Sequence, residues 1–320
     1  MTPKEFWQNF KMCEEQEIAA NFIYDGLKNL HEMDTLSMET EVFPVLYNLS
    51  VGIERLMKVT IVLLEFDENT NVEDFEESLI THSHMELYAR LKPHNKLKLG
   101  KVHMDLLQLL TTFYHSHRYH RFTLQSGTPA AKDKKALHDF IAKYLNIDVT
   151  EDFPMTCVWN TPEIKKFMGK TVKKITKNLY SIIDESARSK NLYTYEISAG
   201  GSKAGKVLWG DELLDFEDED RIKIESLIFL MNLKGSGLVE TIKEIAPLPL
   251  DPALDTDHLQ NLLRVRAFGS DSIRDEIESE YEELKDVKQR LEIIDLIRNP
   301  GVSFGEINEE ENSSPGVSDL

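Results

Sequence analysis

Apolar residues recur every three or four positions along most of this chain, which is the period of an α-helix with one buried face. Such stripes run through residues 18–30, 136–145 and 162–183, and residues 44–66 are apolar on nearly every side. Residues typical of helix starts precede several of them: Thr2-Pro3, Ser83 with Glu86 three positions on, and Thr161-Pro162. The pattern predicts a mainly α protein.

One stretch alternates like a β-strand instead. Residues 192–197 alternate apolar and polar side chains, residues 200–205 are rich in glycine, and residues 206–209 have the composition of a returning strand. The sequence therefore predicts a small β-hairpin near residues 192–209.

Composition divides the chain into three parts. Residues 148–154 look like a loop, so we expect a helical bundle over 1–150 and a second helical region, carrying the hairpin, over 151–300. Residues 301–320 contain five acidic side chains and no basic one, which is typical of a disordered tail. Within the second region, apolar positions from Ile273 to Ile297 recur at a mean near the coiled-coil repeat. A long helix over 271–298 is expected there, with a protein partner as its possible contact.

Charge and cysteine content narrow the class of protein. The net charge is −19, from 37 basic and 56 acidic residues. This charge argues against a protein that coats nucleic acid through its overall electrostatic field, but it allows local basic patches. The two cysteines, Cys13 and Cys157, do not form a disulfide scaffold or a cysteine zinc site and favour a cytoplasmic location. No secretory leader is evident, and the longest apolar run, 59–64, is too short to span a membrane, so no membrane contact is expected.

Two motifs that resemble ligand sites are better explained otherwise. Residues 200–206 match the phosphate-binding G-x-x-x-x-G-K loop, but Val207 stands where a magnesium-binding Ser or Thr belongs. We therefore expect a turn there and no cofactor. Seven of the ten histidines lie between residues 82 and 120, yet they lack carboxylate partners at helical spacing, so no metal site is expected. These histidines serve as caps and packing groups, or as acids and bases near neutral pH. The seven are His82, His84, His94, His103, His115, His117 and His120.

Charged residues on two predicted helices leave alternatives open. A basic stripe on the helix that starts at Pro162 is a solvated face, a complement to the acidic run 211–220, or a contact for phosphate backbone. Its candidate binding residues are Lys166, Lys170 and Lys173. On the apolar 44–66 helix, the polar residues Asn48, Glu54, Arg55 and Lys58 require partners when buried, most commonly an ion pair within the chain or across a dimer interface. Because so apolar a helix needs covering, we expect a homodimer through it, with complete burial in one chain as the alternative.

Residues 41–122 resemble the HEPN superfamily. The resemblance lies in the apolar helix containing Gly52-Ile53-Glu54-Arg55-Leu56-Met57-Lys58, the Thr81-His82-Ser83 helix start followed by Leu87 and Leu91, and the Arg118-Tyr119 pair at a helix end. It implies an α-helical bundle, often dimeric, of the kind found in prokaryotic toxin–antitoxin, abortive-infection and RNA-processing systems. Glu54, Arg55 and Lys58 would then line a cleft near Arg118, and His82 is a further candidate binding residue.

The spacing of one motif departs from that family. Its ribonucleases carry an Arg followed four to six residues later by a His, whereas here His120 follows Arg118 after one residue. One reading is a metal-independent endoribonuclease of a defence or toxin type, in which Arg118 or Arg121 stabilises phosphate charge and His120 or His117 moves the proton. The others are a non-catalytic nucleotide- or RNA-binding module and a helical scaffold for protein partners.

Overall fold

The chain is mainly α-helical, as the apolar periodicity predicts. The computed structural model describes residues 2–67, 69–94, 97–117, 132–147, 157–192, 203–209, 214, 216–263, 271–299 and 301–304. The described residues form no β-strand. An antiparallel bridge pairs Thr35 with Trp159.

The structure divides into two compact units, residues 1–216 and 217–320. We predict a boundary near residue 150, but the helix that follows this point packs along the central helix of the first unit, so the first unit continues to Phe216. Each unit is described by itself.

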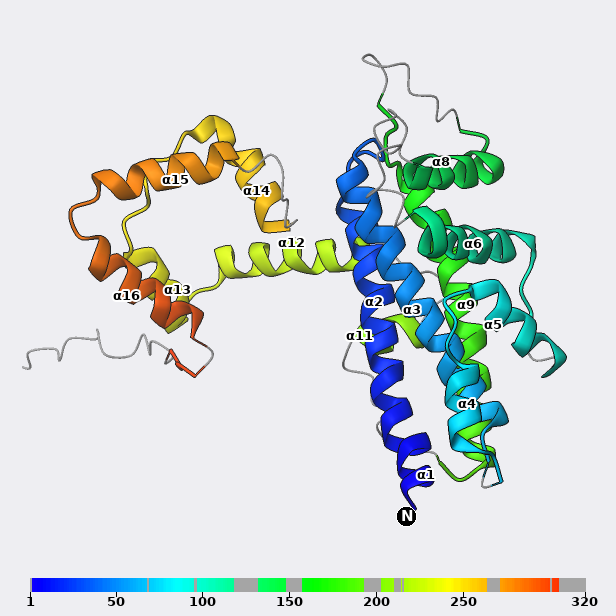
Figure 1. Ribbon diagram of the computed structural model, residues 1–320. Helices are drawn as coiled ribbons and strands as arrows, with labels where there is room; N and C mark the ends of the chain where they lie inside the picture. The colour runs from blue at the N-terminus through cyan, green and yellow to red at the C-terminus, as the bar shows by residue number, and fades with distance from the viewer. Residues whose placement is uncertain are drawn as a thin grey trace, which may run out of the picture. The chain divides into compact units, whose positions relative to one another are not determined.

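Unit 1 is a bundle around two long neighbouring helices, α2 and α3 (Figure 1). Helix α9 lies along α3, helices α5, α6 and α8 also contact α3, and the short α11 contacts both α2 and α9. The helices of unit 1 are α1 Pro3–Phe6, η1 Trp7–Lys11, α2 Met12–Glu32, α3 Glu39–Glu65, α4 Val72–Ser78, α5 His84–Leu91, η2 Lys92–His94, α6 Lys101–Thr112, η3 Phe113–His117, α8 Lys132–Leu145, α9 Pro162–Ser189 and α11 Lys203–Leu208. The predicted N-caps Thr2, Ser83 and Thr161 each accept a hydrogen bond from a backbone N–H of the first turn.

Unit 2 consists of shorter helices with few buried side chains. Helices α12 and α14 contact each other, and the Arg290 side chain donates to the Ala246 carbonyl, 2.7 Å away. Its helices are α12 Glu217–Asn232, α13 Gly237–Glu244, η5 Pro252–Leu254, α14 Asp255–Leu263, α15 Asp271–Glu283 and α16 Val287–Arg298.

The core of unit 1 depends on the close approach of α2 and α3. A Cβ atom added to Gly52 would lie 2.7 Å from the Ala19 carbonyl oxygen and 2.6 Å from a side-chain carbon of Ile23. Only hydrogen fits at this position, so the two backbones are held closer than larger residues would allow. Gly26 makes a second tight contact, with the side chain of Leu49.

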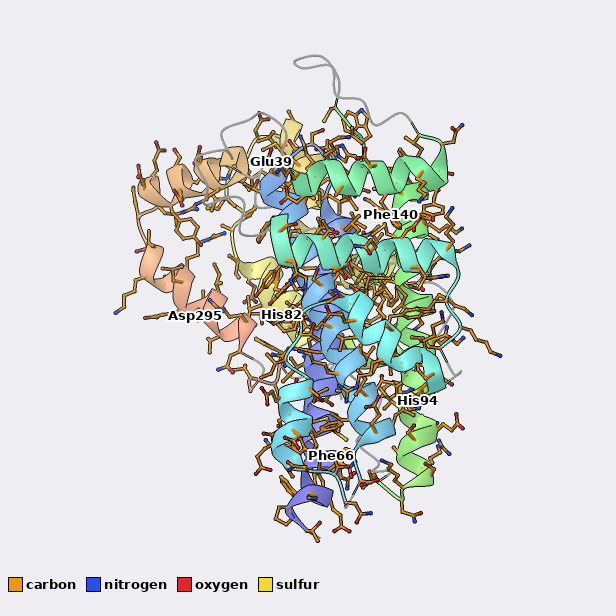
Figure 2. All side chains as sticks on the ribbon, turned by 45° about the vertical axis from the view of Figure 1, so that its right-hand side comes forward. Glu39, Phe66, His82, His94, Phe140 and Asp295 are labelled. Atoms are coloured by element: carbon orange, nitrogen blue, oxygen red, sulfur yellow. The ribbon has the colours of Figure 1, made fainter. Side chains whose placement is uncertain are left out.

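Most of helix α3 is covered by the rest of its own chain. Its buried residues include Val45 and Ile61, whereas Val51, Arg55 and Lys58 lie on a half-buried stripe along one face. Figure 2 shows the helix running from Glu39 to the end closed by Phe66. Burial within one chain thus accounts for most of its apolar sequence, and the homodimer through this helix stays a prediction. No described helix is long and apolar enough to cross a membrane.

The predicted hairpin is wrong where the structure describes it. Residues 206–209 do not return as a strand, because residues 203–208 form helix α11. Ala204, Val207 and Leu208 lie on one face of that helix and are buried, in a short element that contacts α2 and α9. This tertiary burial overrides the β preference of the local sequence. Residues 193–202, the rest of the hairpin, lie outside the described residues.

The single long helix over 271–298 is also wrong, because α15 ends at Glu283 and α16 begins at Val287. Asp286, at the N-cap of α16, has non-helical backbone angles, φ −119° and ψ 47°. Its side chain makes no capping hydrogen bond, and residues 284–286 form the turn that separates the two helices. A protein partner for this region stays a prediction, as does the disordered tail, since only residues 301–304 of it are described.

Replacing Gly52 with Ala should destabilise unit 1. Although Ala favours helix by about 1 kcal/mol, the added methyl has to displace backbone atoms of α2, and overpacking of this kind costs about 1–3 kcal/mol. Urea unfolding followed by circular dichroism measures the difference. Gly26→Ala is the comparison and should cost less, because its nearest neighbour is a leucine side chain. Unchanged or higher stability of Gly52→Ala would show that the helices have room to separate.

Candidate functional site

A groove of about 350 Å³ lies along α3 in unit 1. It combines a floor of apolar side chains with charged and aromatic groups on its walls. Its lining residues are Trp7, Met12, Glu15, Val51, Glu54, Arg55, Lys58, Val59, Val62, Leu79, His82 and Tyr114. All four binding candidates predicted around this helix, Glu54, Arg55, Lys58 and His82, lie in this one groove.

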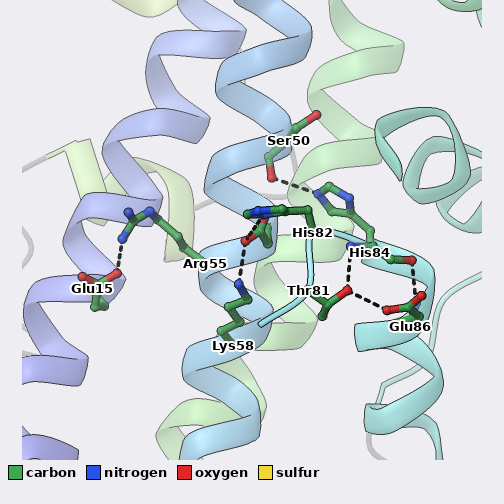
Figure 3. Close-up of polar contacts among 10 residues, drawn as sticks. Glu15, Ser50, Arg55, Lys58, Thr81, His82, His84 and Glu86 are labelled. Atoms are coloured by element: carbon green, nitrogen blue, oxygen red, sulfur yellow. Dashed lines mark hydrogen bonds and ion pairs between the residues drawn. The ribbon is translucent and has the colours of Figure 1, made fainter. Parts of the chain in front are cut away.

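Glu54 is the centre of the polar contacts in the groove (Figure 3). Its side chain is only 8% exposed, and it accepts a hydrogen bond of 2.7 Å from Lys58, one helical turn further along α3. His82 Nδ1 lies 3.1 and 3.2 Å from the two oxygens of the same carboxylate. Because an ionised carboxylate only accepts, Nδ1 carries the proton in this contact. The negative charge of the buried Glu54 is therefore balanced by Lys58, and the same carboxylate contacts the imidazole of His82.

The loop between α4 and α5 places His82 over Glu54. Ser83 accepts from the Glu86 N–H and so begins helix α5, while the Thr81 hydroxyl donates to the Glu86 carboxylate at 2.6 Å. The Ser83 N–H in turn donates to Thr81 Oγ1. This network, visible in Figure 3, fixes the residues on both sides of His82. The side chain of His82 is 53% exposed, and its Nε2 has no hydrogen-bond partner among the described residues.

Two aromatic side chains of the groove come from π-helical turns. Trp7 begins η1, at the start of the chain, and Tyr114 lies in η3, at the end of α6. The Tyr114 ring lies 4.7 Å from the His82 ring, centroid to centroid, and packs on the other side against Tyr47. π-Helical turns are rare and frequently occur at functional sites. The groove thus offers flat apolar surfaces beside its charges.

Sequence reasoning missed the three other charged or aromatic members of this groove, Trp7, Glu15 and Tyr114. Glu15, on α2, forms an ion pair with Arg55, 40 residues further along the chain. No local pattern signals that pairing. Trp7 and Tyr114 are also far from Glu54 in sequence, by 47 and 60 residues, and only the packing of α2 and α6 around α3 brings them together.

His84, two residues after His82, is fully buried beside the groove. Its Nε2 donates to the Ser50 carbonyl at 2.9 Å. Burial penalises the charged imidazole and lowers the pKa of His84 to about 4 from an ordinary value of 6.5, against the opposing effects of the Ser50 hydrogen bond and of Glu54. His84 is therefore a neutral, structural histidine that anchors α5 to α3.

The other histidines that the structure describes do not gather into a metal site. His94 lies 3.4 Å from Glu65 at the far end of α3, and His103 accepts from the Gly100 N–H. Burial is the main reason that the pKa of His103 is lowered. Within the described ranges, no group of three or more metal-ligating side chains occurs. Nothing in the described groove therefore provides a ligand set for a cation.

The predicted catalytic residues cannot be placed. Arg118, His120 and Arg121 lie outside the described residues, and of His117 only the backbone, at the end of η3, is described. The last described residue before this segment is His117, three residues after Tyr114. The P-loop interpretation is excluded, because Lys206 lies within helix α11 rather than at the start of a helix.

The basic stripe on α9 is only partly solvated. Lys166 and Lys170 are exposed, but Lys173, predicted on the same face, is buried with 1% exposure. Its ammonium group donates to the carbonyls of Lys206 and Val207, 3.0 Å each, and to that of Trp209. Lys173 therefore closes the C-terminal end of α11, where the last carbonyls have no helical partners. Its assignment as a ligand-binding residue is wrong.

The burial of His84 predicts a pH-dependent stability. In the unfolded chain this imidazole takes up a proton near pH 6.5, whereas in the folded chain it does so only near pH 4. Stability should therefore fall as the pH is lowered from 6.5 to 4, by up to about 3 kcal/mol from this group. Urea unfolding of wild type and of His84→Gln, whose amide keeps a donor for Ser50, at pH 7 and pH 4.5 measures the difference. Equal losses in both proteins would contradict the assignment.

Lys173 and Lys174 form a matched pair of adjacent lysines. Lys173→Met should destabilise unit 1 by about 1–3 kcal/mol, because it leaves carbonyls at the end of α11 without their donor. Lys174→Met, at an exposed position, should stay within about 0.5 kcal/mol of wild type. Chemical denaturation of both variants measures this. A Lys173→Met protein as stable as Lys174→Met would show that α11 does not need the cap.

Comparisons with protein-family models, with curated proteins and with solved structures find no match.

Proposed function

We propose that this protein is a metal-independent, RNA-directed endoribonuclease and that the Glu54–His82 pair in the α3 groove is its acid–base centre. One observation carries the proposal: a half-exposed imidazole holds Nδ1 against a buried carboxylate and leaves Nε2 without a partner among the described residues. A carboxylate in this position fixes the tautomer in which Nε2 accepts a proton, which is how histidine bases are oriented in enzymes.

The rest of the groove fits a segment of RNA. Its volume of about 350 Å³ lies in the range of small-ligand sites. Trp7 and Tyr114 offer surfaces on which bases stack. Lys58 and Arg55 pair with Glu54 and Glu15, and their remaining N–H donors can contact a phosphate. This combination of stacking and phosphate contact favours nucleic acid over an apolar ligand.

RNA supplies its own nucleophile, so this chemistry needs no metal. His82 Nε2 would take the proton of a 2′-hydroxyl, the oxygen would attack the adjacent phosphorus, and the 5′-oxygen would leave with a proton from a second acid. Arg118, His120 and Arg121 begin four residues after Tyr114, and we propose that they provide this acid and further charge for the phosphate. The HEPN resemblance implies the same substrate, and a defence or toxin role follows from that resemblance alone.

Cleavage of labelled RNA in EDTA tests the proposal. Wild type should cleave, and His82→Gln should be at least about 100-fold slower, because it removes the proton acceptor. His94→Gln is the matched control: it removes another histidine that contacts a glutamate of α3, outside the groove, and should cleave like wild type.

The outcomes separate the alternatives. Equal rates for His82→Gln and His94→Gln would contradict a role of His82 in the reaction. Loss of cleavage only in an Arg118→Ala, His120→Ala double variant would move the chemistry to that segment. RNA binding without cleavage by wild type would replace the enzyme with a binding module.

A further inference from the structure

A second hollow, of about 260 Å³, lies on α9 and shares no lining residue with the α3 groove. Its described lining consists of lysines alone: Lys170, Lys173, Lys174 and Lys177. Since Lys173 turns inward to close α11, the three exposed ammonium groups that remain are those of Lys170, Lys174 and Lys177. They are spaced by four and three residues and so follow one face of the helix.

These three lysines are exposed on the surface of α9. Among the described residues of unit 1, none of the ion pairs involves them. On the neighbouring helix α6, Asp105 is engaged by Lys143 and Tyr144. The positive charge of Lys174 also reaches α6, where it contributes to the lowered pKa of His103. In a chain of net charge −19, such a local positive field marks a site for an anion.

We infer that the hollow bounded by Lys170, Lys174 and Lys177 binds the phosphate backbone of single-stranded RNA. From Lys170 to Lys177 the helix rises roughly 10 Å, which matches about three stacked nucleotides. Lysines on flexible stems act as point charges that contact phosphates without reading bases. The apolar side chains of α9, such as Val172 and Ile175, are buried, so this helix has no apolar face for a membrane surface.

This inference extends the proposed function, because a backbone contact on α9 would hold RNA independently of the reaction in the α3 groove. The test is fluorescence anisotropy of a labelled 20-nucleotide single-stranded RNA with 2′-O-methyl groups, which lacks the nucleophile for cleavage, with the full-length protein at several salt concentrations. The variant is Lys170→Gln, Lys174→Gln, Lys177→Gln, with Lys173 kept for α11. Its Kd should rise at least about tenfold, and the slope of log K against log salt should fall by about 2.

A charge-matched variant controls for net charge. Lys11→Gln, Lys135→Gln, Lys288→Gln removes three surface lysines that lie in ion pairs elsewhere and should bind like wild type. Equal Kd values for the two triple variants would overturn the inference. Tighter binding of polyglutamate than of RNA of equal charge would also overturn it, in favour of an acidic peptide.

The two proposals fail separately. His82→Gln keeps the α9 hollow, so in this background the three lysine substitutions should raise the Kd by the same factor as in wild type. If RNA binding depends on the lysines but wild type does not cleave RNA, the α9 inference stands and the nuclease proposal is contradicted. If wild type cleaves RNA but binding does not depend on the lysines, the nuclease proposal stands and the α9 inference is contradicted.

Discussion

The close packing of α2 against α3 is the contact on which unit 1 depends. Gly52 lets α3 approach the backbone of α2 at Ala19, and α9, α5, α6 and α8 then cover the other faces of α3. Because the groove is built on α3, its geometry follows from this pair: Arg55 reaches Glu15 of α2, and Glu54 lies under the loop that starts α5. A shift of one helix would separate the polar groups of the groove.

Several helices of unit 1 end on side chains supplied from far along the sequence. Asn160 donates to the Leu30 and Met33 carbonyls at the end of α2, and Lys190 donates to the Phe66 carbonyl after α3. Lys173 does the same for α11. Carbonyls at helix ends need such donors wherever water is excluded. The same contacts fasten α9 and the segment before it to the α2–α3 pair, which is why residues beyond 150 belong to unit 1.

Local signals were enough to predict helix starts and the polar residues of α3. Thr161-Pro162 and Ser83 mark helix starts through side-chain bonds within one turn, and charges on an apolar helix must have partners. Contacts between distant segments have no such signal. The lysine pattern on α9 does not indicate that Lys173 alone lies under α11. Residues 206–209 have the composition of a strand, and the contacts with α2 and α9 that make them helical cannot be seen in the local sequence.

Helix packing alone does not explain why the groove contains the buried carboxylate of Glu54. The rest of α3 is filled by apolar side chains, and a leucine at residue 54 would cover the neighbouring helix without the cost of desolvating a carboxylate. Lys58 and His82 offset that cost, but they are needed only because Glu54 is there. Lys58, whose side chain is 24% exposed, already pairs with the carboxylate, whereas His82 is 53% exposed and turns its second nitrogen away from it. The cost of burying Glu54 is therefore better explained by the orientation of His82 than by the stability of the bundle.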